Sequence, residues 1–324
     1  MTTFEPAYAR LARSGELARR AEEARRLASP CRLCPRKCGV DRAAGGLGFC
    51  RTGTLARVSH AGPHFGEEPP LRGEGGAGTV FFSGCNMACV FCQNHQISQE
   101  DSGREMTSRE LARVFLELQS QGCHNLDLVS PTHVAAQVLE ALGLAAADGL
   151  RLPVVYNSGG YDAVETLRLF EGVVDIYLPD AKYGDDGPAL RLSKAPGYVE
   201  ANQAALREMF RQVGLLRLTR KGHAEKGLIV RHLVLPNNLA GTESVLRFIA
   251  DELSPSVTVS LMSQYSPCHL AGADPTINRP LTAGEYEAAL DAFDRAGPES
   301  GFIQEFRSQR TGLPDFDKQQ PFQW

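Results

Sequence analysis

Six short apolar segments alternate with helical patterns over most of the chain, and this order limits the possible folds more than any other feature. The apolar segments are TVFF (79–82), LDLV (126–129), LPVVY (152–156), VVDIYL (173–178), LIVRHLVL (228–235) and VTVSLM (257–262). The helical patterns cover 107–121, 134–148, 161–171, about 198–213, 241–253 and 282–296. Apolar strands that alternate with helices are typical of a parallel sheet covered by helices. Six units are too few for a closed eight-unit barrel, so we expect an α/β protein with a partial (β/α)6 barrel, and a site at the carboxyl ends of its strands.

The composition excludes several classes of protein. Of the 324 residues, 43% are hydrophobic and 22% are charged, which is ordinary for a globular enzyme and excludes a disordered chain. The net charge of −4 gives no reason to expect nucleic acid or an anionic membrane as a partner, and no apolar run approaches the roughly 20 residues of a spanning helix. The N-terminus lacks the apolar stretch of a signal peptide, and its arginines are mixed with acidic residues, so we expect a cytoplasmic protein.

Seven of the nine cysteines lie in two groups, and such grouping in a long chain indicates metal binding rather than disulfides. The tighter group is in GCNMACVFCQN (84–94), directly after the first predicted strand, and contains Cys85, Cys89 and Cys92. Three thiolates on one short loop can hold a small inorganic cluster. Because a [4Fe–4S] cluster takes four ligands, three cysteines leave one iron open, and an open position is what a catalytic metal site requires.

The spacing Cys85-x3-Cys89-x2-Cys92, with the aromatic Phe91 before the third cysteine, resembles the radical S-adenosylmethionine (SAM) superfamily. The resemblance implies a partial barrel over about 79–306 and a [4Fe–4S] cluster whose open iron binds SAM, with Phe91 beside the cofactor. One electron from an external reductant of the flavodoxin or ferredoxin type would cleave SAM, and the 5′-deoxyadenosyl radical would abstract a hydrogen from the substrate.

The segments after the second and third strands are the expected places for SAM contacts. The superfamily usually carries a GGE-like motif after the second strand, but here Thr132 and His133 stand in LVSPTHV without that motif, and a capped helix-entry turn is the other interpretation. NSGGY (157–161) resembles the DTNGF turn of glycyl-radical-enzyme activases, with Asn157 and Ser158 at the Asp-Thr positions. The resemblance implies that these two residues bind SAM; a plain strand–helix turn is the alternative.

Three charged residues follow or lie in the next two strands. In YLPDAKY, Asp180 and Lys182 resemble the LDxKH element of the activases, which faces SAM and the substrate; a surface ion pair is the alternative. In LIVRHLVLPNN, Arg231 takes the position of the arginine in IRxxVVPG and would bind the SAM carboxylate. An arginine in a buried strand needs an anionic partner, so a structural ion pair remains open. His232 should point to the opposite face.

The loop SQYSPCHLAG (263–272) follows the sixth strand at the same rim of the sheet. Tyr265 is a candidate for stacking on adenine or substrate. For Cys268 and His269 three interpretations are open: a radical relay, metal ligands, or ordinary loop residues. The catalytic residue is unassigned, with Asp180, Lys182 and Cys268 as candidates. Cys123 is expected to be an inert buried thiol.

The second cysteine group, Cys31, Cys34, Cys38 and Cys50, lies in a glycine-rich stretch (31–78) with few apolar runs. A bound metal could supply folding energy there, and zinc, a single iron and an iron–sulfur cluster all remain open. The start CxLCPRxCGV, together with CQN after the triplet and FIQEF near the C-terminus, resembles a little-characterised branch of pyruvate formate-lyase activase-like proteins.

These patterns predict an N-terminal helix over 3–28 and a four-cysteine metal-binding segment within 1–78, a radical SAM partial barrel in 79–306 and a tail in 307–324. The expected substrate is a protein or peptide, with hydrogen abstraction at a glycine, as in activation of a glycyl-radical enzyme. Radical modification of a small molecule or a peptide side chain is the alternative, and a non-enzymatic zinc-binding interaction protein is the alternative of another class.

Overall fold

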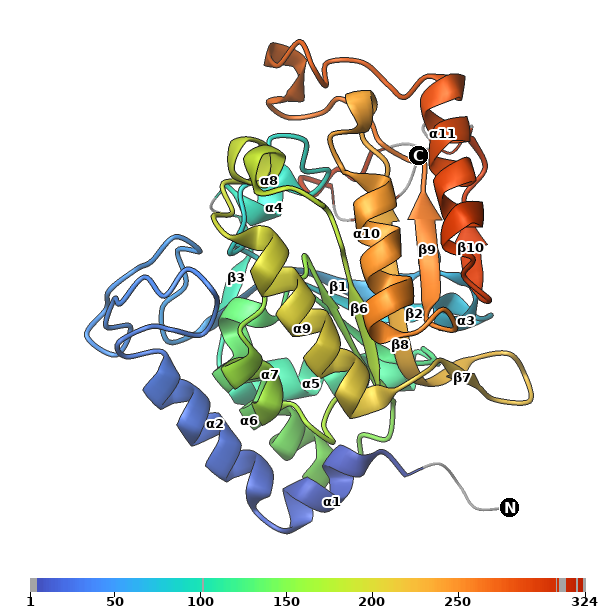
Figure 1. Cartoon of the computed structure of the whole chain (residues 1–324). Coiled ribbons are helices and arrows are strands. Elements are labelled where there is room, and N and C mark those ends of the chain that lie inside the picture. Colours follow the sequence, from blue (N-terminus) through green and yellow to red (C-terminus); the bar gives the residue numbers. More distant parts are fainter. Residues whose placement is uncertain (1–4, 101, 307, 309–312, 319, 323–324) are drawn as a thin grey trace.

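The computed structural model describes residues 5–100, 102–306, 308, 313–318 and 320–322. It has a mostly parallel central sheet covered by helices, which confirms the α/β class, and its strand order agrees with a partial barrel (Figure 1). The strands run β10-β9-β8-β6-β5-β4-β2-β1-β3, and β7 pairs with β8. Their bounds are β1 (Ala56–His64), β2 (Ala77–Phe82), β3 (Arg104–Met106), β4 (Leu126–Val129), β5 (Val154–Ser158), β6 (Ile176–Pro179), β7 (Arg217–Leu218), β8 (Ala224–Leu233), β9 (Thr258–Met262) and β10 (Gly301–Ile303).

The six predicted strands correspond to β2, β4, β5, β6, β8 and β9, which pair parallel in chain order. The larger helices are α5 (Ser108–Ser120), α6 (Ala135–Ala147), α7 (Val164–Leu169), α8 (Asp186–Ser193), α9 (Tyr198–Val213), α10 (Thr242–Phe248) and α11 (Ala283–Ala296). Shorter elements are α3 (Pro69–Arg72), α4 (His95–Ser98), the 3-10 turns η1 (Thr132–Val134), η2 (Pro236–Asn238) and η4 (Ala271–Ala273), and the π-helix η3 (Ile249–Leu253). None of the helices in the described part of the chain is long and apolar enough to cross a bilayer.

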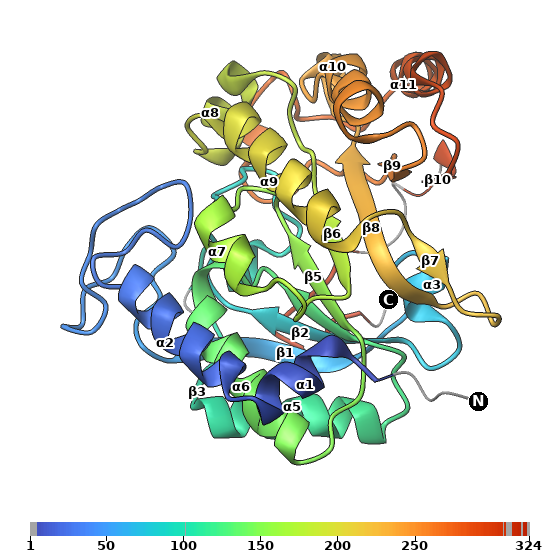
Figure 2. The same cartoon turned by 60° about the horizontal axis from the view of Figure 1, so that its bottom comes forward.

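The N-terminal region differs from the single helix expected over 3–28. It contains α1 (Ala7–Arg13) and α2 (Glu16–Leu27), separated at Gly15, which has φ +77°. Both helices lie against α6 on the outside of the sheet (Figure 2). A left-handed residue cannot continue an α-helix, and glycine takes that conformation without a steric penalty, so the chain turns there. The tail expected over 307–324 falls in part outside the described residues.

The glycine-rich stretch 31–78 has two structurally distinct parts. Between α2 and β1 the described chain forms turns and loops without a helix or strand. The remainder contains β1, which pairs antiparallel with β2, and α3. The periodicity of β1 is hidden because its sequence, ARVSHAGPH, includes Gly62 and Pro63, both of which are uncommon inside strands.

The strands present two different faces. Leu128, Tyr156 and Val230 pack into the main core beneath the helices. Residues next to them in the strands face the opposite side, where six buried apolar residues form a second cluster: Leu71, Val155, Ile176, Leu178, Ala224 and Ile229. Beside that cluster the inner face becomes polar, with Asp127 in β4, Asn157 in β5 and Arg231 in β8. This polar inner face lies towards the carboxyl ends of the parallel strands, where α/β proteins bind ligands.

Candidate metal centre

The loop that carries Cys85, Cys89 and Cys92 follows β2 and is fixed by its neighbours. The backbone N–H groups of Ala88 and Val90 donate to the carbonyls of Ser193 (3.0 Å) and Leu192 (2.8 Å) at the end of α8. These bonds hold the middle of the loop against a regular element, so the thiols are positioned before any ligand binds.

Two of the three thiols of this loop lie beside a serine hydroxyl. The Ser193 hydroxyl donates to Sγ of Cys89 at 2.9 Å, and Sγ of Cys92 lies 3.3 Å from Oγ of Ser98. Burial, followed by the neighbouring Cys89 thiol, raises the pKa of Cys85 and of Cys92 to about 12. Deprotonated thiolates are therefore unfavourable here on their own, and a bound metal cation is the natural source of compensating charge.

The loop offers three free thiols. Three thiols on one loop suit an iron–sulfur cluster with one iron left open, as the sequence predicts.

Lys182 and Asp180 lie beside this loop. Nζ of Lys182 is 2.5 Å from Oδ2 of Asp180, and both side chains are about four-fifths buried, with exposed fractions of 18% and 21%. Burial lowers the pKa of Lys182, but Asp180 and the Cys89 thiol outweigh it, so this pKa is raised above its usual range. The structure thus places the DAK element beside the cysteine triplet. Within that element, Asp180 and Lys182 form an ion pair. Their contact with SAM stays a prediction.

The NSGGY turn after β5 packs against the same loop. A Cβ placed on Gly159 would lie 2.9 Å from Sδ of Met87 and 3.7 Å from Cε of Lys182, so the turn touches both. The Ser158 hydroxyl donates to Asp162 at 2.6 Å, and Nδ2 of Asn157 is 3.5 Å from Oδ2 of Asp127. These contacts occupy both side chains within the protein, and SAM binding by either one is a prediction still.

The residues after β4 are tied into the same buried network. Thr132 donates to Oδ1 of Asp162 at 2.6 Å, and Nε2 of His133 lies 2.9 Å from the carbonyl oxygen of Ser83. Both side chains are buried.

Arg231 forms the structural ion pair that the sequence left open. Its Nε and Nη2 are 2.8 Å and 2.6 Å from the two carboxylate oxygens of Glu68, and Nη2 also contacts Glu67. All three side chains are largely buried. Glu67 and Glu68 come from the chain before α3, more than 160 residues away, and no sequence pattern marked them. His232 faces the other side of β8, as expected, and is buried against Ala181 and Thr242.

The loop after β9 covers the triplet loop. The Tyr265 ring lies edge-on to Phe91 at 5.7 Å, and the Cys268 thiol donates to the Phe91 carbonyl at 3.3 Å. His269 stacks on His95 with 4.5 Å between ring centroids. Phe91 and Tyr265 are both buried, so their contact with SAM or substrate stays a prediction, and sequence reasoning missed His95 entirely. Cys123, ahead of β4, is buried, and burial raises its pKa.

Comparison with known proteins agrees with this geometry. Residues 79–219 match the model of the radical SAM superfamily. A Methanocaldococcus jannaschii protein described as uncharacterized protein MJ0674 is 32% identical over 289 residues, which are 85% of this chain and 78% of that protein. The chain belongs to the same family as that protein, and its residues 79–219 form a radical SAM domain, for which the superfamily implies a [4Fe–4S] cluster and SAM.

Two solved structures are similar in part. One is Streptococcus suis SuiB bound to S-adenosylmethionine, with 9% identity, a TM-score of 0.47, and coverage of 68% of this chain and 48% of that one. The other is HydG, a maturase of the [FeFe]-hydrogenase, with 12% identity, a TM-score of 0.44, and coverage of 68% and 49%. The chain spans about half the length of each.

Proposed function

We propose that this radical SAM enzyme abstracts hydrogen from the backbone of a protein or peptide, at a glycine, and that it activates a glycyl-radical enzyme in this way. When bound, the [4Fe–4S] cluster and SAM supply the 5′-deoxyadenosyl radical that removes the hydrogen. The residues that we expect to bind SAM and substrate lie around the loop of Cys85, Cys89 and Cys92.

The observation that carries the proposal is the position of Lys182. The DAK element resembles the LDxKH element of the activases, and Lys182 lies near both the Cys89 thiol and Gly159 of the NSGGY turn, which supports the proposal. Its ammonium stays charged at neutral pH despite its burial, because Asp180 and the Cys89 thiol offset the lowering of its pKa by desolvation. Although it is paired with Asp180, this ammonium can donate a further charged hydrogen bond to an anionic group of a ligand, such as the SAM carboxylate.

Isotope transfer tests the substrate. A glycine-containing peptide deuterated at the glycine α-carbons is incubated anaerobically with reconstituted enzyme, SAM and reductant. Deuterium in 5′-deoxyadenosine and a glycyl radical signal in the EPR spectrum are expected. If peptides labelled only in their side chains transfer deuterium and α-labelled peptides do not, the proposal is replaced by the alternative of side-chain modification.

The alternatives have distinct outcomes. A small-molecule substrate would leave every labelled peptide inert while a metabolite extract accelerates formation of 5′-deoxyadenosine. A non-enzymatic zinc protein would contain zinc and no iron in the Cys85 loop, and membership of the radical SAM superfamily argues against it.

A further inference from the structure

The four N-terminal cysteines form a second candidate metal site. Cys31, Cys34 and Cys50 are buried, and Cys38 is exposed. The Cys31 and Cys38 thiols contact each other, and the Cys34 thiol lies near Cys31 and Cys50. In Figure 1 the segment is the blue loop region at the left, projecting from the barrel beyond the end of α2. Four thiols gathered in a stretch without a helix or strand, three of them buried, are suited to a metal and have no disulfide partner among themselves.

Two arginines provide positive charge around these thiols. The Arg42 side chain is buried, and its Nη2 donates to Sγ of Cys50 at 3.3 Å while Nη1 donates to the His133 carbonyl at 2.7 Å. The Arg36 guanidinium lies 3.3 Å above the Phe49 ring and is near Cys34 and Cys50. A metal centre with four thiolates is a dianion for both Zn²⁺ and [4Fe–4S]²⁺, so the buried Arg42 and the half-buried Arg36 would compensate the charge of an occupied site.

The four thiols are gathered closely enough to share one metal centre, since Cys31 and Cys38 are in contact and Cys34 lies near Cys31 and Cys50. Four cysteine thiolates are the ligand set of a structural zinc and also of a [4Fe–4S] cluster.

Asn86 connects the two cysteine groups. Its side chain hydrogen-bonds the Cys34 thiol, and its Oδ1 accepts from Sγ of Cys85 at 3.9 Å. The side chain is buried and is fixed by donation from its Nδ2 to the Tyr161 carbonyl. Arg36 also connects the two segments, because its Nε donates a hydrogen bond to the Asn86 carbonyl at 2.5 Å. A single residue therefore contacts one thiol of each group.

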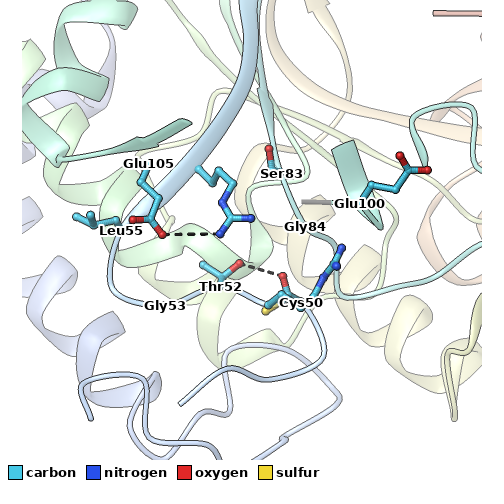
Figure 3. Close-up of a pocket in the computed structure, with 10 residues that line it drawn as sticks. Cys50, Thr52, Gly53, Leu55, Ser83, Gly84, Glu100 and Glu105 are labelled. Carbon is cyan, nitrogen blue, oxygen red and sulfur yellow. Dashed lines mark hydrogen bonds and ion pairs between the residues drawn. The ribbon is translucent and has the colours of Figure 1, made fainter. Parts of the chain in front are cut away.

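The backbones of the two segments are also in direct contact. Gly84 has φ +81°, and a Cβ at this position would lie 2.4 Å from the carbonyl oxygen of Cys50, so only glycine permits this approach. Figure 3 draws the small cavity at this contact, with Cys50 and Thr52 on one side and Ser83 and Gly84 on the other. The segments that carry the two cysteine groups are therefore held together by close backbone packing at Gly84 and Cys50.

We propose that Cys31, Cys34, Cys38 and Cys50 hold an iron–sulfur centre that passes electrons to the Cys85, Cys89 and Cys92 cluster through the contact made by Asn86. An external one-electron reductant reduces the N-terminal centre at the exposed Cys38 side. That centre is reoxidised when it gives its electron to the second cluster, so one electron enters and one reaches the cluster for each SAM consumed. This inference rests on the proposed function only in taking the triplet as the site of the cluster that accepts the electron.

Metal content tests the first half of the inference. After anaerobic reconstitution, the wild type should hold about eight irons and the Cys85/Cys89/Cys92→Ala triple variant about four, as expected for two four-iron clusters. Zinc without iron in the triple variant would overturn the inference. EPR of the fully reduced wild type should also show broadening by two interacting paramagnetic centres, and the triple variant should lose it. Sharp, non-interacting signals in the wild type count against contact through Asn86.

The rate at which the Cys85 cluster is reduced tests the proposed electron transfer through Asn86. Reduced flavodoxin is mixed with oxidised protein in the absence of SAM, and freeze-quench EPR follows reduction of the Cys85 cluster. Asn86→Leu should slow this reduction several-fold at unchanged iron content. The matched control is Asn125→Leu, which removes another buried amide whose Nδ2 donates to the distant Leu71 carbonyl at 2.7 Å, and it should reduce at the wild-type rate. Equal rates for Asn86→Leu and wild type overturn the relay. Because the readout precedes SAM cleavage, failure to cleave SAM would count against the proposed function alone.

Discussion

Nζ of Lys182 lies 2.5 Å from Oδ2 of Asp180, and the same ammonium faces the thiol of Cys89. The pair therefore connects the end of β6 to the metal loop after β2. A charged hydrogen bond in a largely buried site contributes about 1.5–3 kcal/mol, and its loss should be visible in function.

Replacement of Lys182 by methionine tests this connection. Lys182→Met keeps the length of the side chain and removes the charge, so SAM affinity should fall about ten- to hundredfold while iron content is unchanged. Equilibrium binding of SAM to the reconstituted protein measures the effect. Lys221→Met, on an exposed turn before β8, is the control and should bind SAM like the wild type. Unchanged affinity in Lys182→Met would assign Lys182 to a purely structural ion pair.

Loss of one cysteine of the Cys85, Cys89 and Cys92 loop should abolish both cluster binding and SAM cleavage. Cys89→Ala removes the thiol that accepts a hydrogen bond from Ser193, and with it one of the three cluster ligands. The variant should lose iron from this site and form no 5′-deoxyadenosine in an anaerobic assay with SAM and dithionite. Cys123→Ala, which replaces an isolated buried cysteine, should keep both properties. Formation of 5′-deoxyadenosine by Cys89→Ala at the wild-type rate would falsify the assignment of the triplet.

Arg231 predicts a change in stability. Arg231→Ala leaves Glu67 and Glu68 buried without a cation, and removal of one partner from a buried ion pair typically costs about 3–5 kcal/mol. Urea denaturation should show this loss of stability. The triple variant Arg231→Met/Glu67→Gln/Glu68→Gln, which removes all three of these charges, should recover part of the free energy of unfolding.

The same variants separate the two roles expected for Arg231. If Arg231 binds the SAM carboxylate, the stability-restored triple variant still loses SAM affinity while holding its iron. If that variant binds SAM with wild-type affinity, the role of Arg231 is the ion pair with Glu67 and Glu68.

Asp175 gives the protein a pH dependence in the acid range. Burial raises the pKa of Asp175 to about 7, against the hydrogen bond from the Val154 N–H at 2.9 Å, which lowers it. Between about pH 4 and 7 the folded state binds the proton and the unfolded state does not, so the free energy of unfolding falls as the pH rises, by at most about 1.4 kcal/mol per pH unit. Asp175→Asn should flatten this slope in thermal denaturation at several pH values. A slope equal to that of the wild type would show that Asp175 titrates normally.

Local signals in the sequence predicted most of the regular structure. The six parallel strands coincide with near-continuous apolar runs, and the capping box Thr107–Glu110 at the start of α5 forms both of its expected hydrogen bonds. The pairing of Arg231 with Glu67 and Glu68 was not predictable, because its partners are brought near only by the folding of the β1–β2 connection over the inner face of the sheet. The contact of Asn86 with both cysteine groups was missed for the same reason, since one asparagine in a loop carries no pattern. Spacing along the chain identifies ligands on one loop, whereas contacts between distant loops depend on the tertiary structure.

The antiparallel pairing of β1 with β2 has a practical consequence for anyone who wishes to express the barrel alone. The superfamily match begins at residue 79, inside β2, so a protein trimmed to that match would lack β1 and part of its neighbour. The parallel sheet would then end in an open edge of unpaired backbone groups, which recruits other chains and leads to aggregation. We expect soluble protein only when the expressed chain begins before β1, so that the edge of β2 stays paired.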